Sequence, residues 1–259
     1  MIKEEFNKFV KVFKGLDKQV LVILVSIAFL QTISWYITSR RFFQNNLTQY
    51  FPDTELRNIY EFAYWFIGDF ITYLLVPLLI IIFIFKKPLS QFGLQLGDYR
   101  FGLTLSILFI ALMMPIVWII SASQDFIFQY PHLSLARSDW KIFIVYEVGI
   151  LFYLLAWEFI WRGFTLFGLY EKFGGYAILI QMIPFVMLHN GKPFAETLGA
   201  IAGGIILGYF AIRTKSIYYC IITHMGVMFM IDLIVTLRFR TSEYGIGLSS
   251  ILNIIKELF

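Results

Sequence analysis

Four residues of types that can do chemistry lie in long apolar stretches of the C-terminal half: Glu158, Arg162, His189 and His224. A charge near the centre of a membrane costs from about 3 kcal/mol upward, so each of these residues needs a physical reason. Glu158 and Arg162 are four residues apart and can pair on one face of a helix. One carboxylate and two imidazoles are enough for a general base that activates water and for groups that stabilise an oxyanion.

The same residues leave a metal site open. Glu158, His189 and His224 match a ligand set found at catalytic zinc sites, which is two histidines and one glutamate with an open position. The H-E-x-x-H zinc helix is absent, as are a G-x-S-x-G elbow and a Walker A loop. The cofactor prediction is therefore zinc or none.

Each of these residues also has a purely structural interpretation. The pair of Glu158 and Arg162 could be an ion pair at a helix end, and a histidine inside a membrane is commonly a hydrogen-bond partner between helices. Glu147 lies eleven residues before Glu158, almost three helical turns, and is expected to point the same way. A face that stays polar over roughly 16 Å predicts a water-accessible cavity. His132, in a Tyr-Pro-His loop, is expected to be solvated.

The elements that must position these residues are predicted to be membrane helices. The chain is 59% hydrophobic and 15% charged, whereas soluble domains are about a quarter charged. Several stretches of about 18 or more residues lack charges and could cross the hydrocarbon core. The predicted fold is all-α, a polytopic transmembrane helical bundle of seven or eight spans with a catalytic-type core formed by the last four. The expected spans are about 20–38, 60–85, 102–121, 141–169, 176–189, 194–212 and 216–235.

Four regions follow from this pattern. They are an amphipathic N-terminal segment (1–18), N-terminal transmembrane helices (19–121), the core (141–235) and a C-terminal tail (236–259). Between them, 122–140 is expected to form an interfacial helix and turn. The second span contains Glu61 and Asp69 and should partly face protein. Four glycines at spacings of four, Gly199/Gly203 and Gly204/Gly208, predict close helix contacts.

The distribution of lysines and arginines along the chain indicates how the spans are oriented in the membrane. The net charge of +4 comes mainly from lysines and arginines that flank the spans, so no nucleic-acid partner is expected. Lys and Arg are somewhat more numerous on the side of the N-terminus, which favours a cytoplasmic N-terminus. Residues 1–18 mix lysines with apolar residues at helical spacing, which predicts a helix on the membrane surface rather than a cleavable signal peptide. Cys220 is predicted to be a packed side chain.

The order of motifs resembles a known family. Glu158-Phe159-Ile160-Trp161-Arg162-Gly163, then Phe185 with His189 four residues later, then His224, is similar to the CPBP family of intramembrane endopeptidases. This family, also called Abi, includes the CAAX proteases and bacteriocin-processing enzymes, among them the type II CAAX prenyl endopeptidase. Its pattern is E-E-x-x-x-R, F-x-x-x-H and H-x-x-x-N/D on separate helices. The similarity covers about 145–235, and 87–98 resembles the stretch that precedes the family's core.

The resemblance implies a membrane-embedded endopeptidase. Glu158 and His189 would activate water, His224 would hold the oxyanion and Arg162 would fix the glutamate. The enzyme would be a metalloendopeptidase or a glutamate-dependent protease without metal. Its partners would be membrane lipid and a membrane-associated protein or peptide, with or without a prenyl group, in a bacterial inner membrane. The oligomeric state stays open.

Two positions depart from the family's pattern. The first residue of the glutamate doublet is Trp157, and the residue four after His224 is Met228. Asp232, one turn further, and Asn190 are possible substitutes for the missing polar residue. These departures define an alternative, a catalytically inactive relative that acts as a membrane scaffold or bacteriocin-immunity factor. A small membrane transporter is a second alternative, although the chain lacks the two related halves expected of one.

Overall fold

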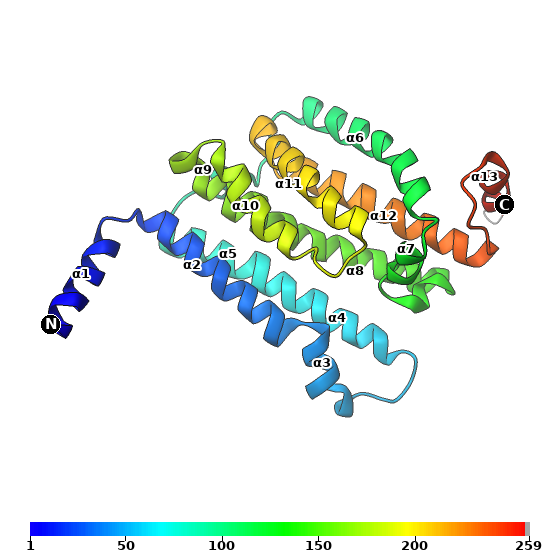
Figure 1. The fold of residues 1–259 in the computed structure, drawn as a ribbon, viewed down its shortest axis with the longest axis horizontal. Coiled ribbons are helices and arrows are strands. Elements are labelled where there is room, and N and C mark those ends of the chain that lie inside the picture. The colour runs from blue at the N-terminus through cyan, green and yellow to red at the C-terminus, as the bar shows by residue number, and fades with distance from the viewer. Residues whose placement is uncertain (257–259) are drawn as a thin grey trace.

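The computed structural model describes residues 1–256, and all regular secondary structure within that range is helical (Figure 1). Six helical segments are long and apolar enough to cross a membrane. They are Lys18–Asn46, Arg57–Phe85, Tyr99–Ile120, Trp140–Phe173, Phe194–Thr214 and Tyr218–Thr241. A shorter apolar helix, α10 (Tyr176–Met187), packs against α11 (Phe194–Thr214). The predicted polytopic helical bundle is confirmed, with six long helices and one short one.

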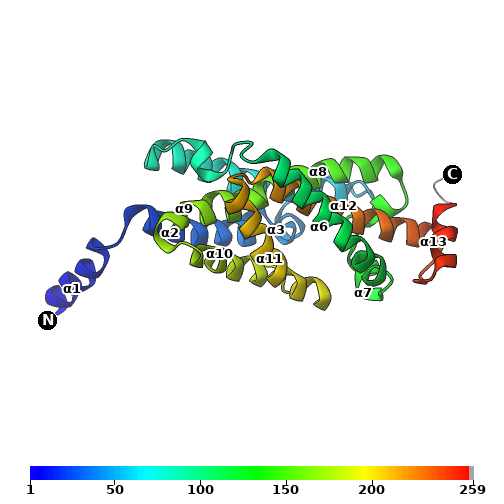
Figure 2. The same ribbon diagram turned by 90° about the horizontal axis from the view of Figure 1, so that it is seen from above.

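The two ends of the described chain project from opposite ends of the bundle (Figures 1 and 2). Helix α1 (Ile2–Lys14) has no buried residue, and its helical form agrees with the predicted amphipathic segment. Helix α13 (Leu248–Ile255) lies beyond the end of α12 (Tyr218–Thr241). The placement of α1 on a membrane surface stays a prediction.

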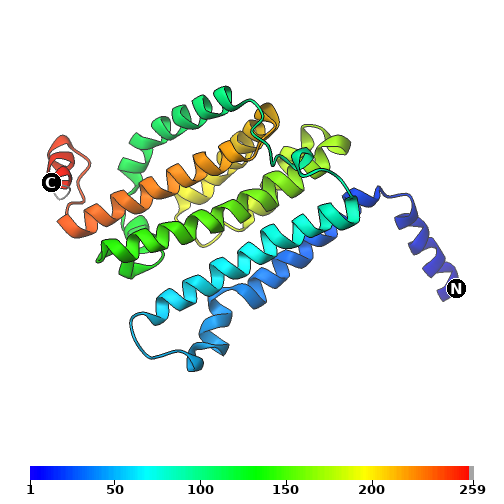
Figure 3. The ribbon, with the colours of Figure 1, turned by 180° about the vertical axis from the view of Figure 1, so that it is seen from behind.

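The first two long segments run side by side along one edge of the bundle (Figure 3). The first consists of α2 (Lys18–Ile33), the π-helical turn η1 (Ser34–Thr38) and α3 (Arg40–Asn46). The second begins with α4 (Arg57–Phe70) and continues through η3 (Ile71–Leu75), α5 (Val76–Leu79) and η4 (Ile80–Phe85). Glu61 and Asp69 of α4 are both buried, so this span faces protein as predicted. Glu61 is held by Arg40, whose Nε lies 2.5 Å from Oε1.

One long helix runs through the centre of the bundle (Figure 3). It comprises α8 (Trp140–Glu158), the π-helical η7 (Phe159–Phe167) and α9 (Gly168–Phe173). It ends at Gly174, which has a positive φ of 52°, a conformation that glycine adopts readily. Helix α6 (Tyr99–Ile120) packs against α12, and α12 packs against α8. The carboxylate of Glu158 is therefore placed where α8 passes into η7, deep in the bundle.

The glycine prediction is half right. Cβ atoms built at Gly204 and Gly208 would lie 2.8 Å from Met182 and 2.9 Å from Ile178, so α11 approaches α10 closely at these two positions. Nothing lies within 4 Å of such atoms at Gly199 and Gly203, which face open space. Close contact is therefore limited to the half of α11 that crosses α10.

The segment between α6 and α8 folds back beneath α8. It contains α7 (Gln124–Gln129) and a 3-10 turn, η6 (Ser134–Arg137), in agreement with the predicted helix and turn. The tail begins later than predicted, because α12 continues to Thr241. Arg238 holds this extension against α6, donating hydrogen bonds to the carbonyl oxygens of Trp118 (2.9 Å) and Gly245 (2.8 Å).

Candidate active site

Glu158 and Arg162 form a fully buried ion pair, as their spacing predicts. The Nη1 atom of Arg162 donates to Oε1 of Glu158 at 3.1 Å, and neither side chain has exposed area. The guanidinium carbon of Arg162 lies 4.2 Å from the centre of the Phe185 ring, a cation–π contact that links η7 to α10. The other carboxylate oxygen, Oε2, has no partner among the described residues.

His224 shares the same carboxylate oxygen. Its Nδ1 atom lies 2.6 Å from Oε1 of Glu158. A carboxylate only accepts hydrogen bonds, so Nδ1 carries the proton and Nε2 is left with a free lone pair. A carboxylate that orients an imidazole in this way is the arrangement that lets histidine act as a general base.

His189 is held in the same tautomer by a different oxygen. Its Nδ1 atom lies 2.7 Å from the carbonyl oxygen of Phe185, one turn earlier in the chain. The backbone carbonyl accepts, so Nε2 of His189 is again the free acceptor nitrogen. The two imidazoles thus both offer Nε2 rather than Nδ1.

Both histidines line one cavity of about 130 Å³. Its wall is formed by Trp65, His132, Ile150, Tyr153, Leu154, Trp157, Leu188, His189, Lys192, His224 and Met228. Glu158 is not part of this wall and contacts the cavity only through His224. The structure therefore brings Glu158, Arg162, His189 and His224 together. His224 lies between the Glu158 carboxylate and the cavity.

Trp157 and Met228 occupy the cavity wall at the two positions that depart from the resembled pattern. The Trp157 indole lies 5.9 Å from the Phe185 ring and 6.3 Å from the His189 ring, measured between centroids. An indole beside His189 cannot remove a proton from water, and a thioether beside His224 is a poor hydrogen-bond partner. Neither Asp232 nor Asn190 lines the cavity, so the proposed substitutions are not seen.

Comparison with known families finds one match, and it covers the part of the chain that carries this site. Residues 139–230 match the family model described as type II CAAX prenyl endopeptidase Rce1-like. This stretch of the chain is similar to the Rce1-like family. The Rce1-like core starts at the first residue before α8, ends within α12 and contains all four predicted site residues. No curated protein and no solved structure matches the chain.

The polar face predicted for the central helix of the Rce1-like core is wrong. The cavity is lined from α8 by Ile150, Tyr153, Leu154 and Trp157, which are apolar or aromatic. Glu147 instead neighbours Asp232 of α12, and both side chains are buried away from the cavity. Helical phase alone placed Glu147 on the same face as Glu158. In the structure the two carboxylates have different neighbours in α12, which are Asp232 for Glu147 and His224 for Glu158.

His132, which precedes the Rce1-like core, was wrongly predicted to be solvated. It is partly buried and lines the cavity with the other two histidines. Its Nδ1 atom lies 3.0 Å from the carbonyl oxygen of Gln129. Burial, and then the nearby charge of Lys192, lower the pKa of His132 to about 3. No motif marks this residue, because the loop reaches the cavity only after the chain folds back under α8.

Lys192 is the cation of the cavity wall. Its Nζ atom donates to Oε1 of Glu196 at 2.7 Å and to the hydroxyl of Tyr130 at 3.3 Å. The Tyr130 hydroxyl also donates to the second Glu196 oxygen. This network fixes the turn after His189 against the segment that carries His132.

The residues do not fit the zinc site that was left open. Among residues 1–256, no group of three or more His, Cys, Asp or Glu side chains is placed to hold a metal ion. Oε1 of Glu158 is already occupied by Arg162 and His224, and the guanidinium would oppose a second cation there.

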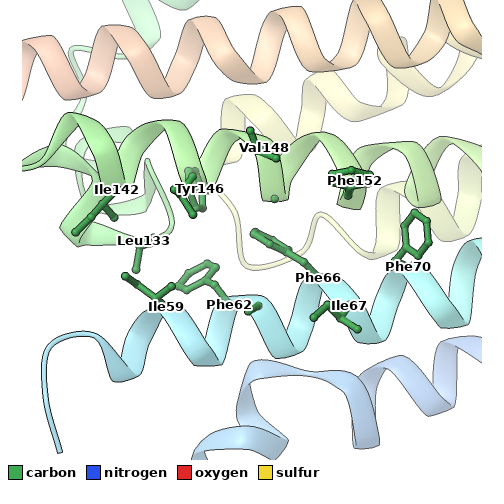
Figure 4. Close-up of a pocket in the computed structure, with 13 residues that line it drawn as sticks. Ile59, Phe62, Phe66, Ile67, Phe70, Leu133, Ile142, Tyr146, Val148 and Phe152 are labelled. Carbon is green, nitrogen blue, oxygen red and sulfur yellow. The ribbon is translucent and has the colours of Figure 1, made fainter. Parts of the chain in front are cut away.

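A larger pocket lies elsewhere, between α4 and α8 (Figure 4). Its volume is about 420 Å³, and aromatic and aliphatic side chains such as Phe62, Phe66 and Phe152 line it. None of the three histidines reaches this pocket. Its apolar wall suits lipid contact rather than hydrolysis.

Proposed function

We propose that the chain is an intramembrane endopeptidase of the Rce1-like type in which His224, held by Glu158, activates water. The observation that carries this proposal is the 2.6 Å contact between Nδ1 of His224 and Oε1 of Glu158 at the wall of a cavity shared with His189. These roles differ from those that the family resemblance implies, in which Glu158 activates water and His224 holds the oxyanion. Glu158 becomes a positioning residue and His224 the base.

The proposed reaction needs three groups of the cavity. Water in the cavity gives a proton to Nε2 of His224 while its oxygen attacks the peptide carbonyl carbon. Nε2 of His189 accepts the second hydrogen of that water and so fixes its orientation. The electron pair of the carbonyl moves to oxygen, where the ammonium of Lys192 stabilises the charge. His224 then passes its proton to the nitrogen of the leaving amine as the C–N bond breaks.

The substrate and location follow from the same proposal. The chain is a multi-pass membrane protein with a buried cavity, so the scissile bond would belong to a membrane-associated protein or peptide, with prenylated peptides as the first class to test. We place the protein in a bacterial inner membrane. The excess of Lys and Arg on the side of α1 favours a cytoplasmic N-terminus.

Turnover of an internally quenched farnesylated peptide by the full chain in maltoside micelles tests this function. We expect wild-type cleavage, and a loss of at least 100-fold for His224→Gln and for His189→Gln. A suitable control is His132→Gln, which changes an imidazole of the same cavity that has no step in the proposed reaction. Turnover equal to wild type in both of the first two variants would reject the proposal.

A non-catalytic relative is the second candidate, and Trp157 is the observation that favours it. The indole fills the cavity wall beside His189, where the resembled family has a carboxylate. The discriminating variant restores both family residues, Trp157→Glu with Met228→Asn. Cleavage that appears only in this double variant would assign a binding or scaffold role to the natural protein.

A further inference from the structure

A second pocket adjoins the histidine cavity. It has a volume of about 290 Å³ and lies between the end of α2, α4 and α8. Five aromatic residues and one carboxylate contribute to its wall: Trp35, Trp65, Tyr73, Tyr153, Trp157 and Asp69. The pocket shares Trp65, Tyr153, Trp157 and Leu188 with the histidine cavity, so the two cavities have a common wall.

Asp69 is a buried carboxylate without a cation. It is 2% exposed, and it accepts hydrogen bonds of 2.8 Å from the hydroxyls of Ser34 and Thr38 and from the indole nitrogen of Trp65. No ion pair among residues 1–256 includes it. A carboxylate has about four acceptor positions, so one is left for a ligand. An unpaired charge in a membrane helix is costly and by default indicates a functional site.

The surrounding rings are suited to a cation. Trp65 and Tyr153 have ring centroids 4.8 Å apart, and Tyr153 is stacked on Trp157 at 5.8 Å. Tyr73 meets Trp157 edge to face at 6.2 Å. The faces of tryptophan and tyrosine attract cations within about 6 Å, most strongly when water is excluded. A carboxylate among such rings therefore favours an organic ammonium or guanidinium over a neutral or anionic group.

The two arginines of the pocket wall do not occupy this position. Arg40 is paired with Glu61 at 2.5 Å, and its guanidinium stacks over Phe62 at 4.1 Å. Arg41 is exposed at the rim, where solvent screens its charge. The inner end of the pocket, around Asp69, is its anionic part.

We propose that the aromatic pocket around Asp69 binds a basic side chain of the peptide whose scissile bond lies at His189 and His224. The inference rests on the proposed peptidase function, since the shared wall of the two cavities is what connects the cation site to cleavage. Asp69 would pair with the ammonium of a substrate lysine, and Trp65, Tyr153 and Trp157 would enclose its methylene chain and charge.

Binding of n-butylammonium, a mimic of the lysine side chain, tests the site without catalysis. Saturation-transfer NMR on the full chain in maltoside micelles should show binding of this cation and none of n-butanol, its neutral counterpart. Asp69→Asn keeps the size of the side chain and removes its charge, and should weaken binding at least tenfold. Asp53→Asn, the same change at a carboxylate that is 93% exposed, is the matched control and should bind as wild type does.

A second variant, Trp35→Leu, tests the same site in case Asp69→Asn does not fold. Trp35 is 61% exposed, so Trp35→Leu should keep the thermal stability of wild type while weakening butylammonium binding. Equal binding by wild type and Asp69→Asn, or equal binding of the alcohol and the amine, would overturn the proposal. Tighter binding of glycerophosphoethanolamine that depends on Arg41 would also overturn it, because the ligand would then be a lipid headgroup.

Cleavage of paired peptides links the site to function. Wild type should cleave a peptide with lysine near the scissile bond at least tenfold more efficiently than its norleucine counterpart, and Asp69→Asn should abolish this preference. Absence of all cleavage, with butylammonium binding intact and dependent on Asp69, would reject the peptidase function and leave the cation site standing. A preference that is unchanged in Asp69→Asn would reject the assigned ligand.

Discussion

The Nδ1 atom of His224 lies 2.6 Å from Oε1 of Glu158, so a carboxylate with no exposed area is coupled to the cavity wall by one imidazole. The contact sets the tautomer of His224 and leaves Nε2 as the nitrogen available for a reaction. In the proposed mechanism, the chain can retain a base although tryptophan stands at position 157, because the carboxylate would act through the histidine and would not need to reach water.

Removing the charge of Glu158 should affect both activity and stability. In Glu158→Gln, the guanidinium of Arg162 is left buried without a counter-charge, which typically costs about 3–5 kcal/mol. We expect a lower melting temperature in micelles and at least a 100-fold loss of peptide cleavage. The double variant Glu158→Gln with Arg162→Gln removes both charges and should recover most of the stability but not the activity. Recovery of both would show that the pair has only a structural role.

Two glycines of α11 should be sensitive to added side chains, and two should not. Valine at Gly208 would collide with Ile178, since even a Cβ atom would lie 2.9 Å away, and should lower the melting temperature by several degrees. Gly203 has open space at the same point, so Gly203→Val is the matched control. Equal destabilisation by both changes would mean that helix propensity, not the contact with α10, decides the effect.

Acid should destabilise the protein partly through His132. Burial lowers its folded-state pKa to about 3, below the ordinary value, so between pH 6.5 and pH 3 the unfolded chain binds the proton more readily. Stability from this residue is present above pH 6.5 and is lost as the pH falls. Between pH 7 and pH 5, the free energy of unfolding should therefore fall by about 1–2 kcal/mol less in His132→Gln than in wild type. Parallel melting curves at the two pH values would contradict this assignment.

Lys192 should matter for the transition state more than for binding. Lys192→Met combined with Glu196→Gln removes both charges of the ion pair, so no buried carboxylate is left uncompensated. Because the ammonium is assigned to the developing oxyanion, we expect kcat to fall about 100-fold while KM changes little. Glu196→Gln alone keeps the ammonium and should retain most of the activity. A change confined to KM would instead make Lys192 a substrate-binding group.

Much of the architecture could be predicted from hydropathy, because a membrane helix must satisfy its own backbone and bury few charges. The pairing of Glu158 with Arg162 follows from a spacing of four residues, which fixes neighbours on any helix. The burial of Asp69 follows in the same way, because a charge in a membrane span is expected to face protein. Each of these predictions depends on one helix and its immediate surroundings.

Contacts between distant segments could not be predicted in this way. His132 reaches the cavity because the loop before α8 folds back, and no local pattern encodes that path. Glu147 was assigned to the cavity from its helical phase, but its carboxylate instead lies next to Asp232 on α12, away from the cavity. The pocket around Asp69 could not be predicted, because its aromatic wall comes from three separate segments.

Steady-state cleavage of the farnesylated peptide by wild type and His224→Gln tests the central claim most directly. If His224 is the base, kcat/KM should fall by at least 100-fold from wild type to the variant. Unchanged kcat/KM in His224→Gln would contradict the account, because the buried Glu158 has no other route to the cavity.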